Sequence, residues 1–291
     1  MHGGISDCNA VCYQPPACGP VKPLHILMLT MFIDLAGFAM FIPLLNYIVA
    51  ELGGSILTVG LLITAFSLAQ FACLPAWGRL SDRIGRRPVI MLGLGGAAVA
   101  YAVFGLADPA LGLSDDRRLL LGVLFLSRIM LGVMSANYAA AYAYVADVTP
   151  PEERAQGMGM LGVAFGLGFV CGPVLGGLLG QWGFWLPAFF GSGLALLNLY
   201  CAWRWLPESL PPDHVVRPRV SPGEALRETL AYLRQPRLGL LLVIFTLYLL
   251  AFSIIFGTFV EFSKERIGLP VRLSGVLFAY MGGVSIVTQG G

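Results

Sequence analysis

The sequence predicts an all-α membrane protein whose chain crosses the bilayer several times. Of the 291 residues, 57% are hydrophobic and 12% are charged, whereas soluble domains carry about 25% charged residues. The long apolar runs show no period-two alternation, so they fit membrane-spanning helices and not the strands of a barrel. This composition argues against a soluble enzyme, and a net charge of +2 gives no basic surface for nucleic acid.

Eight spans follow one another along the chain. A helix needs about 20 apolar residues to cross the hydrocarbon core of a bilayer, and charges, prolines and glycines bound runs of that length here. The predicted spans lie near 24–47, 57–77, 89–107, 119–146, 157–180, 184–206, 238–262 and 274–291. Residues 24–206 are therefore expected to form a six-helix transmembrane bundle, and residues 238–291 to supply two helices of a second, partial bundle.

Two polar segments flank the first bundle. Residues 1–23 lack the apolar core of a signal peptide, so they are expected to be a disordered cytoplasmic leader. Residues 207–237 are rich in proline and charge and are expected to link the two membrane units on the cytoplasmic side. Ser221, Pro222 and Glu224 form a helix-start signal, which predicts either a short amphipathic helix on the membrane surface or a solvated linker helix.

The basic residues predict the orientation of the chain. With a cytoplasmic N-terminus, most of the Lys and Arg residues that flank the spans fall on the inner side. Because inner loops of membrane proteins carry an excess of positive charge, this distribution supports that orientation. We therefore expect a multi-pass protein of the plasma or inner membrane.

A charged segment, residues 78–90, joins the second and third predicted spans. Its candidate gating residues are Gly78, Asp82, Arg83, Gly85, Arg86 and Arg87. The two glycines allow a tight helix-to-helix turn. The aspartate and the arginines can form a charge-assisted network that locks or releases neighbouring helices. A merely positive inner loop would explain the arginines but not the placement of the glycines and the aspartate.

The fifth predicted span contains glycines at regular spacing. The positions that stand out are Gly159, Gly168, Gly172, Pro173, Gly176 and Gly177. Small residues four positions apart allow two helices to approach closely, and the proline bends its helix. A glycine-rich span by itself would indicate tight packing only.

Two ionisable residues lie inside predicted spans. Asp34 in the first span and Arg128 in the fourth each lie ~15 Å deep, near the middle of the hydrocarbon core. Charged groups at this depth are costly and are functional candidates. A buried carboxyl group can take up and release a proton under the influence of a nearby charge, so Asp34 is the candidate proton carrier and Arg128 its regulator. The alternative is a structural Asp34–Arg128 ion pair with no role in transport.

Polar and aromatic side chains at mid-membrane depth are candidates for a binding cavity. We select Gln70, Asn137, Tyr138 and Tyr142, with Tyr101 and Asn198 as secondary candidates. The alternative for each side chain is an ordinary contact between helices.

These motifs resemble those of the major facilitator superfamily. The 78–90 segment resembles the family signature G-x-L-a-D-r-x-G-r-r, and residues 145–154, which include Asp147, resemble the loop after the family's fourth helix. Residues 206–209 resemble the usual exit from its sixth helix. The glycines of the fifth span reproduce the spacing of the family's antiporter motif.

The first and fourth spans resemble a subgroup, the drug:proton antiporters of the tetracycline and multidrug efflux type. Asp34 followed by Pro43 is similar to their first-helix motif, and Arg128 falls in the pattern L-x-x-x-R-x-x-q-G, whose glutamine is Leu131 here. The chain departs from tetracycline exporters at Ala100, where those proteins carry an acidic residue.

The resemblance implies a transporter and not an enzyme. It implies a proton-coupled antiporter that exports small molecules such as drugs or antibiotics by alternating access, with Asp34 and Arg128 coupling the proton and Asp147 joining the gating motif. The proton gradient would supply the energy, and we expect no cofactor and no metal. An uptake permease for a small solute is the nearest alternative. Because the family has twelve helices, a non-transporting truncated product, or a half-transporter that needs a second subunit, is the other.

Overall fold

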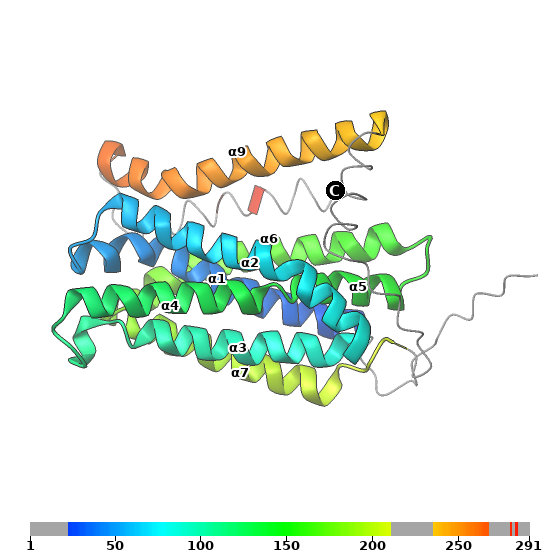
Figure 1. Ribbon diagram of the computed structural model, residues 1–291, viewed down its shortest axis with the longest axis horizontal. Coiled ribbons are helices and arrows are strands. Elements are labelled where there is room, and N and C mark those ends of the chain that lie inside the picture. The colour runs from blue at the N-terminus through cyan, green and yellow to red at the C-terminus, as the bar shows by residue number, and fades with distance from the viewer. Residues whose placement is uncertain (1–22, 211–234, 268–279, 281–282, 285–291) are drawn as a thin grey trace, which may run out of the picture.

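The computed structural model describes residues 23–210, 235–267, 280 and 283–284. Every regular element in these ranges is a helix (Figure 1). The α-helices are α1 (Pro23–Glu51), α2 (Ile56–Ile84), α3 (Arg86–Gly105), α4 (Arg117–Ser135), α5 (Tyr138–Val148), α6 (Arg154–Leu179), α7 (Trp185–Trp205) and α9 (Pro236–Ile267), and two short 3₁₀ helices are η1 (Pro109–Leu111) and η2 (Gly180–Trp182). The predicted leader, the predicted linker helix and nearly all of the eighth predicted span lie outside the described residues.

Six segments of the described chain are long and apolar enough to cross a membrane, with α4 and α5 together making one of them. They coincide with the six predicted spans of the first bundle, and α9 covers the seventh predicted span. The prediction of an all-α polytopic fold is therefore confirmed.

Helix α1 packs against α6 and α7, and its apolar residues are buried on several faces. Helix α3 packs on α7 and α4, and α4 also packs on α2. Figure 1 shows α3 and α7 along one side of the bundle and α9 along the opposite side. The chain reverses direction between successive spans, so the C-terminal ends of α2, α5 and α7 meet at one end of the bundle.

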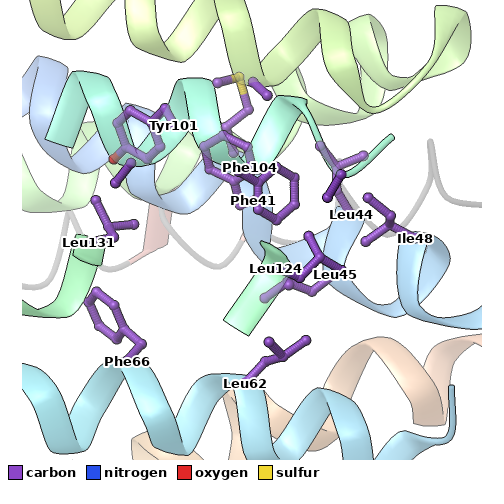
Figure 2. Packing of buried hydrophobic residues seen from close by; sticks show 14 of the residues in the cluster. Phe41, Leu44, Leu45, Ile48, Leu62, Phe66, Tyr101, Phe104, Leu124 and Leu131 are labelled. Carbon is purple, nitrogen blue, oxygen red and sulfur yellow. The ribbon is translucent and has the colours of Figure 1, made fainter. Parts of the chain in front are cut away.

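An aromatic group lies at the centre of the main apolar cluster. Figure 2 shows Phe41 of α1 beside Tyr101 and Phe104 of α3. The ring centroids of Phe41 and Tyr101 are 5.0 Å apart in a stacked arrangement, and those of Phe41 and Phe104 are 4.6 Å apart, edge to face. Leu62 of α2 and Leu124 of α4 are fully buried in the same cluster, and Ala188 and Ala195 of α7 also belong to it, so five helices share one apolar core.

The prediction of a tight turn from Gly78 to Gly85 is wrong for most of its length. Helix α2 continues through Ile84, so Gly78, Asp82 and Arg83 are helical, and only Gly85 turns the chain into α3. Gly85 has φ +104°, a backbone conformation that favours glycine. A Cβ atom on Gly85 would also collide with the carboxylate of Glu208.

The fourth predicted span is not one continuous helix. It breaks at Ala136 and Asn137, where α4 ends and α5 begins. Asn137 is 1% exposed, and its side chain fills the space beside Gly93 of α3, where a Cβ atom would overlap it. The break thus coincides with the burial of the Asn137 side chain against a glycine. Helix α5 begins at the next residue, Tyr138.

Candidate functional site

A cavity of about 500 Å³ opens between α1, α2, α5 and α6. Most of its wall is aromatic or aliphatic, from Leu35, Phe38, Phe66, Phe71, Leu74, Ala139, Phe165 and Phe169. Its polar side chains are Ser67, Gln70, Tyr138 and Tyr142, and none of the described lining residues is charged. Volume and lining both match those of sites for small molecules.

Three of the four cavity residues selected from the sequence line this cavity: Gln70, Tyr138 and Tyr142. Asn137 lies outside the lining because its amide packs against α3 at Gly93. The secondary candidate Asn198 is fully buried and donates from Nδ2 to the carbonyl oxygen of Thr30 at 2.9 Å. Asn137 and Asn198 therefore act as contacts between helices in this structure.

Asp34 is 5% exposed and lies beside the cavity. The hydroxyl of Tyr138 donates a hydrogen bond to its carboxylate. Because the next residue along α1, Leu35, and Tyr138 itself both line the cavity, the Asp34 carboxylate is one hydrogen bond away from the cavity wall. The sequence placed this carboxyl group in the middle of a span, and the structure adds its partner.

Arg128 is 3% exposed and lies against two aromatic rings instead of beside a carboxylate. Its guanidinium carbon is 4.6 Å from the centroid of the Phe104 ring and 5.1 Å from that of Phe41. Cation–π contacts of this kind stabilise a desolvated cation. Within the described part of the chain, Arg128 and Asp34 form no ion pair, so the alternative of a direct structural pair does not describe this structure.

The charged motif forms a network at the end of the bundle where α2, α5 and α7 finish, which we call the charged end. Arg86 is 8% exposed and contacts three side chains. Its Nη1 lies 2.6 Å from Asp82 Oδ1 and donates to Ser81 Oγ at 2.6 Å, and its Nε donates to Asp147 Oδ2 at 3.1 Å. The network thus joins the end of α2, the start of α3 and the end of α5.

Glu208, just after α7, completes the charged end. Its carboxylate accepts from the backbone N–H groups of Arg86 at 2.8 Å and Arg87 at 3.2 Å, the first two residues of α3. A negative charge at this position caps the helix and complements its dipole. Ser209 Oγ also donates to Asp147 Oδ2 at 3.1 Å.

The remaining charged-motif residues take simpler positions. Gly78 has open space where a Cβ atom would lie, and Arg83 is exposed. Arg87 Nη2 donates to the backbone oxygen of Trp203 at the end of α7. In the sequence, Glu208 and Ser209 stand out only as part of the family-like segment 206–209. Nothing in the sequence indicates that Glu208 accepts from the start of α3 or that Ser209 donates to Asp147.

The glycines of the fifth span divide into two groups. Gly168, Gly172 and Gly176 face α1 so closely that a Cβ atom on any of them would overlap Leu35, Ala36, Ala39 or Met40. Gly159 and Gly177 have open space at the corresponding position. Pro173 lies inside α6. Close packing of α1 on α6 therefore depends on one row of glycines, spaced four residues apart.

Known proteins share these features. The family model described as the Major Facilitator Superfamily matches residues 27–291. The tetracycline resistance protein, class E, of Escherichia coli is 32% identical over 275 residues, which cover 92% of this chain and 64% of that protein. Multidrug resistance protein 2 of Bacillus subtilis (strain 168) is 29% identical over 278 residues, covering 92% and 65% respectively.

A solved structure agrees with the sequence comparison. The crystal structure of the human organic anion transporter MFSD10 (TETRAN) is similar with a TM-score of 0.71 and 28% sequence identity, over 92% of this chain and 70% of that one. The chain spans a little less than two thirds of the length of the two resistance proteins. Motifs, fold and comparisons agree, and the chain belongs to the Major Facilitator Superfamily, where it resembles the tetracycline and multidrug resistance proteins.

Proposed function

We propose that this protein is a secondary active transporter that exports small molecules in exchange for protons. The observation that carries the proposal is the hydrogen bond from Tyr138 to Asp34. Tyr138 is at once a partner of the buried carboxylate and part of the cavity wall. A bound molecule that moves the Tyr138 hydroxyl would therefore change the environment of the Asp34 carboxylate. Conversely, the charge of Asp34 would change how the Tyr138 hydroxyl is oriented in the cavity wall.

The cavity lining supports a lipophilic, aromatic cargo. Phe38, Phe66, Phe165 and Phe169 offer ring faces, and the Phe165 and Phe169 rings are themselves stacked with centroids 4.6 Å apart. Ring faces attract other aromatic molecules and delocalised cations. Gln70 and the tyrosines add a few hydrogen-bonding groups that can orient the cargo. A planar aromatic cation such as ethidium fits this chemistry.

The charged end is the proposed gate. With the N-terminus in the cytoplasm, as the distribution of basic residues favours, this end faces the cytoplasm of a cell whose plasma or inner membrane holds the protein. The Arg86 network and the Glu208 cap hold α2, α3, α5 and the exit of α7 together. Alternating access would open and close this end as the bundles move.

The proposal is tested by loading proteoliposomes with ethidium and imposing a pH gradient across the membrane. The 291-residue chain should move the dye faster with the gradient than without it. Asp34→Asn keeps the size of the side chain and its ability to accept from Tyr138 but cannot carry a proton, so it should abolish the gradient-driven component. Asp115→Asn, an acid-to-amide change at an exposed loop position, is the matched control and should behave like the unmodified chain.

Two results would refute the proposal. Gradient-driven ethidium movement that persists in Asp34→Asn would contradict a role of Asp34 in proton coupling. If ethidium binds the purified protein but moves across the membrane equally fast with and without it, the chain does not transport the dye.

A further inference from the structure

Tyr101 of α3 is a buried tyrosine that lines no part of the cavity described above. The side chain is 2% exposed. Its hydroxyl interacts electrostatically with both Asp34 and Arg128. Those two residues come from α1 and α4, so Tyr101 joins three helices at one buried point.

Packing fixes the position of the Tyr101 hydroxyl. On one side, its oxygen atom would be 3.3 Å from a Cβ atom added to Gly37, one turn beyond Asp34 on α1. On the other side, the Tyr101 ring stacks on the Phe41 ring (Figure 2). The Phe41 ring also contacts the Arg128 guanidinium. Because Gly37 carries no side chain, the Tyr101 hydroxyl can lie close to α1, one turn from Asp34.

A tyrosine hydroxyl suits this position because it can donate one hydrogen bond while its oxygen faces a cation. Donation toward a carboxylate favours the ionised form of the acid, and a cation behind the oxygen strengthens that donation. Arg128 can therefore act on Asp34 through Tyr101 without forming an ion pair with it.

We propose, on the basis of the proton-coupled function above, that Tyr101 is a positioning residue that links Arg128 to Asp34 and favours the ionised carboxylate once its proton has left. The proton is released from the Asp34 carboxyl group to solvent, and the tyrosine keeps its own proton throughout. Tyr138 contacts Asp34 from the cavity side, and Tyr101 acts from the side away from the cavity.

The other surroundings of Asp34 do not offer an alternative link. Helix α5 contributes Tyr138, and Tyr142 in turn interacts with Tyr138. Within the described part of the chain, α2, α6 and α7 contact this part of α1 through the uncharged residues Phe66, Gly168 and Asn198. Among the described residues, Tyr101 and Tyr138 are thus the titratable groups that interact with Asp34, and Tyr101 also interacts with Arg128.

The test measures ethidium binding to the purified full chain in detergent as a function of pH, using dye fluorescence. In the unmodified chain, protonation of Asp34 should compete with the dye, and Asp34→Asn should remove the pH dependence. Tyr101→Phe keeps the ring that stacks on Phe41 but removes the hydroxyl. Because an electrostatic interaction that would favour the ionised carboxylate is lost, the midpoint should move to higher pH by about one unit.

Tyr200→Phe is the matched control, since Tyr200 lies exposed on α7, and it should leave the midpoint unchanged. Superimposable profiles for Tyr101→Phe and the unmodified chain, or a shift to lower pH, would overturn the role of Tyr101. If binding to the unmodified chain is itself independent of pH, the proposed proton coupling fails instead. The two ideas can thus be rejected separately.

Discussion

The glycine row on α6 makes a sharp prediction about stability. Gly172→Ala adds one methyl group at the contact with α1, and Gly177→Ala adds the same group five residues further along the same helix, where it meets open space. Both changes give α6 the same gain in helix propensity, about 1 kcal/mol. The difference in stability between the two variants therefore reports the packing of α1 on α6.

The magnitude follows from the distances at Gly172. Its new Cβ atom would lie 2.7 Å from the backbone oxygen of Ala36 and 2.7 Å from the Cβ atom of Ala39, whereas ordinary contacts begin at 3.4 Å. The two helices must separate by about 0.7 Å, because neither backbone nor a methyl group can rotate away. Overpacking of this kind costs about 1–3 kcal/mol.

Thermal unfolding of the purified proteins in detergent measures this cost. For chains of this size, 1 kcal/mol changes Tm by about 2–4 °C. Gly172→Ala should therefore unfold at least about 2 °C below Gly177→Ala. Equal Tm values, or a higher Tm for Gly172→Ala, would refute the conclusion that this glycine row sets the distance between α1 and α6.

Three further predictions concern the cap, the coupling bond and the cavity. Glu208→Ala removes the carboxylate that caps α3 and should lower the free energy of unfolding by about 1 kcal/mol, while Glu152→Ala at an exposed position should not; thermal unfolding compares the two. Tyr138→Phe removes the donor to Asp34 and should slow gradient-driven ethidium movement about tenfold, and an unchanged rate would exclude this hydrogen bond from the coupling. Phe169→Leu removes a ring face from the cavity and should weaken ethidium binding about fivefold, whereas Phe190→Leu on the exposed side of α7 should not, as dye titration would measure.

Composition and span length were sufficient to predict the fold, because a bilayer forces apolar runs of this length to be helices. Depth along a span was likewise sufficient to find Asp34 and Arg128, since few residues in these runs are ionisable. Gln70, Tyr138 and Tyr142 were found by the same reasoning and line one cavity.

The partners of those residues depend on the rotation of each helix about its axis, which apolar runs do not encode. All faces of a helix in lipid are apolar, so no polar stripe reveals which face meets which neighbour. The position of Arg128 against Phe41 and Phe104, and not beside Asp34, is a consequence of such rotations. The same limit explains Asn137, whose depth resembles that of Tyr138 but whose side chain packs on α3.

Contacts between distant segments were also beyond sequence reasoning. Arg86 and Glu208 are separated by 122 positions, and their hydrogen bond exists because α2 and α7 end at the same level. The turn at Gly85 was placed too broadly because glycine at 78 is compatible with a helix, whereas the positive φ at 85 is not favourable for another residue.

Proton counting tests the central claim most directly. Ethidium carries a permanent charge and binds or releases no proton of its own near neutral pH, so any pH change on mixing it with the purified chain in weakly buffered detergent comes from the protein. If cargo and proton occupy the protein alternately, binding should release up to about one proton per dye molecule from the unmodified chain and none from Asp34→Asn. The same proton release from both proteins, or dye binding to the unmodified chain without any release, would contradict coupling through Asp34.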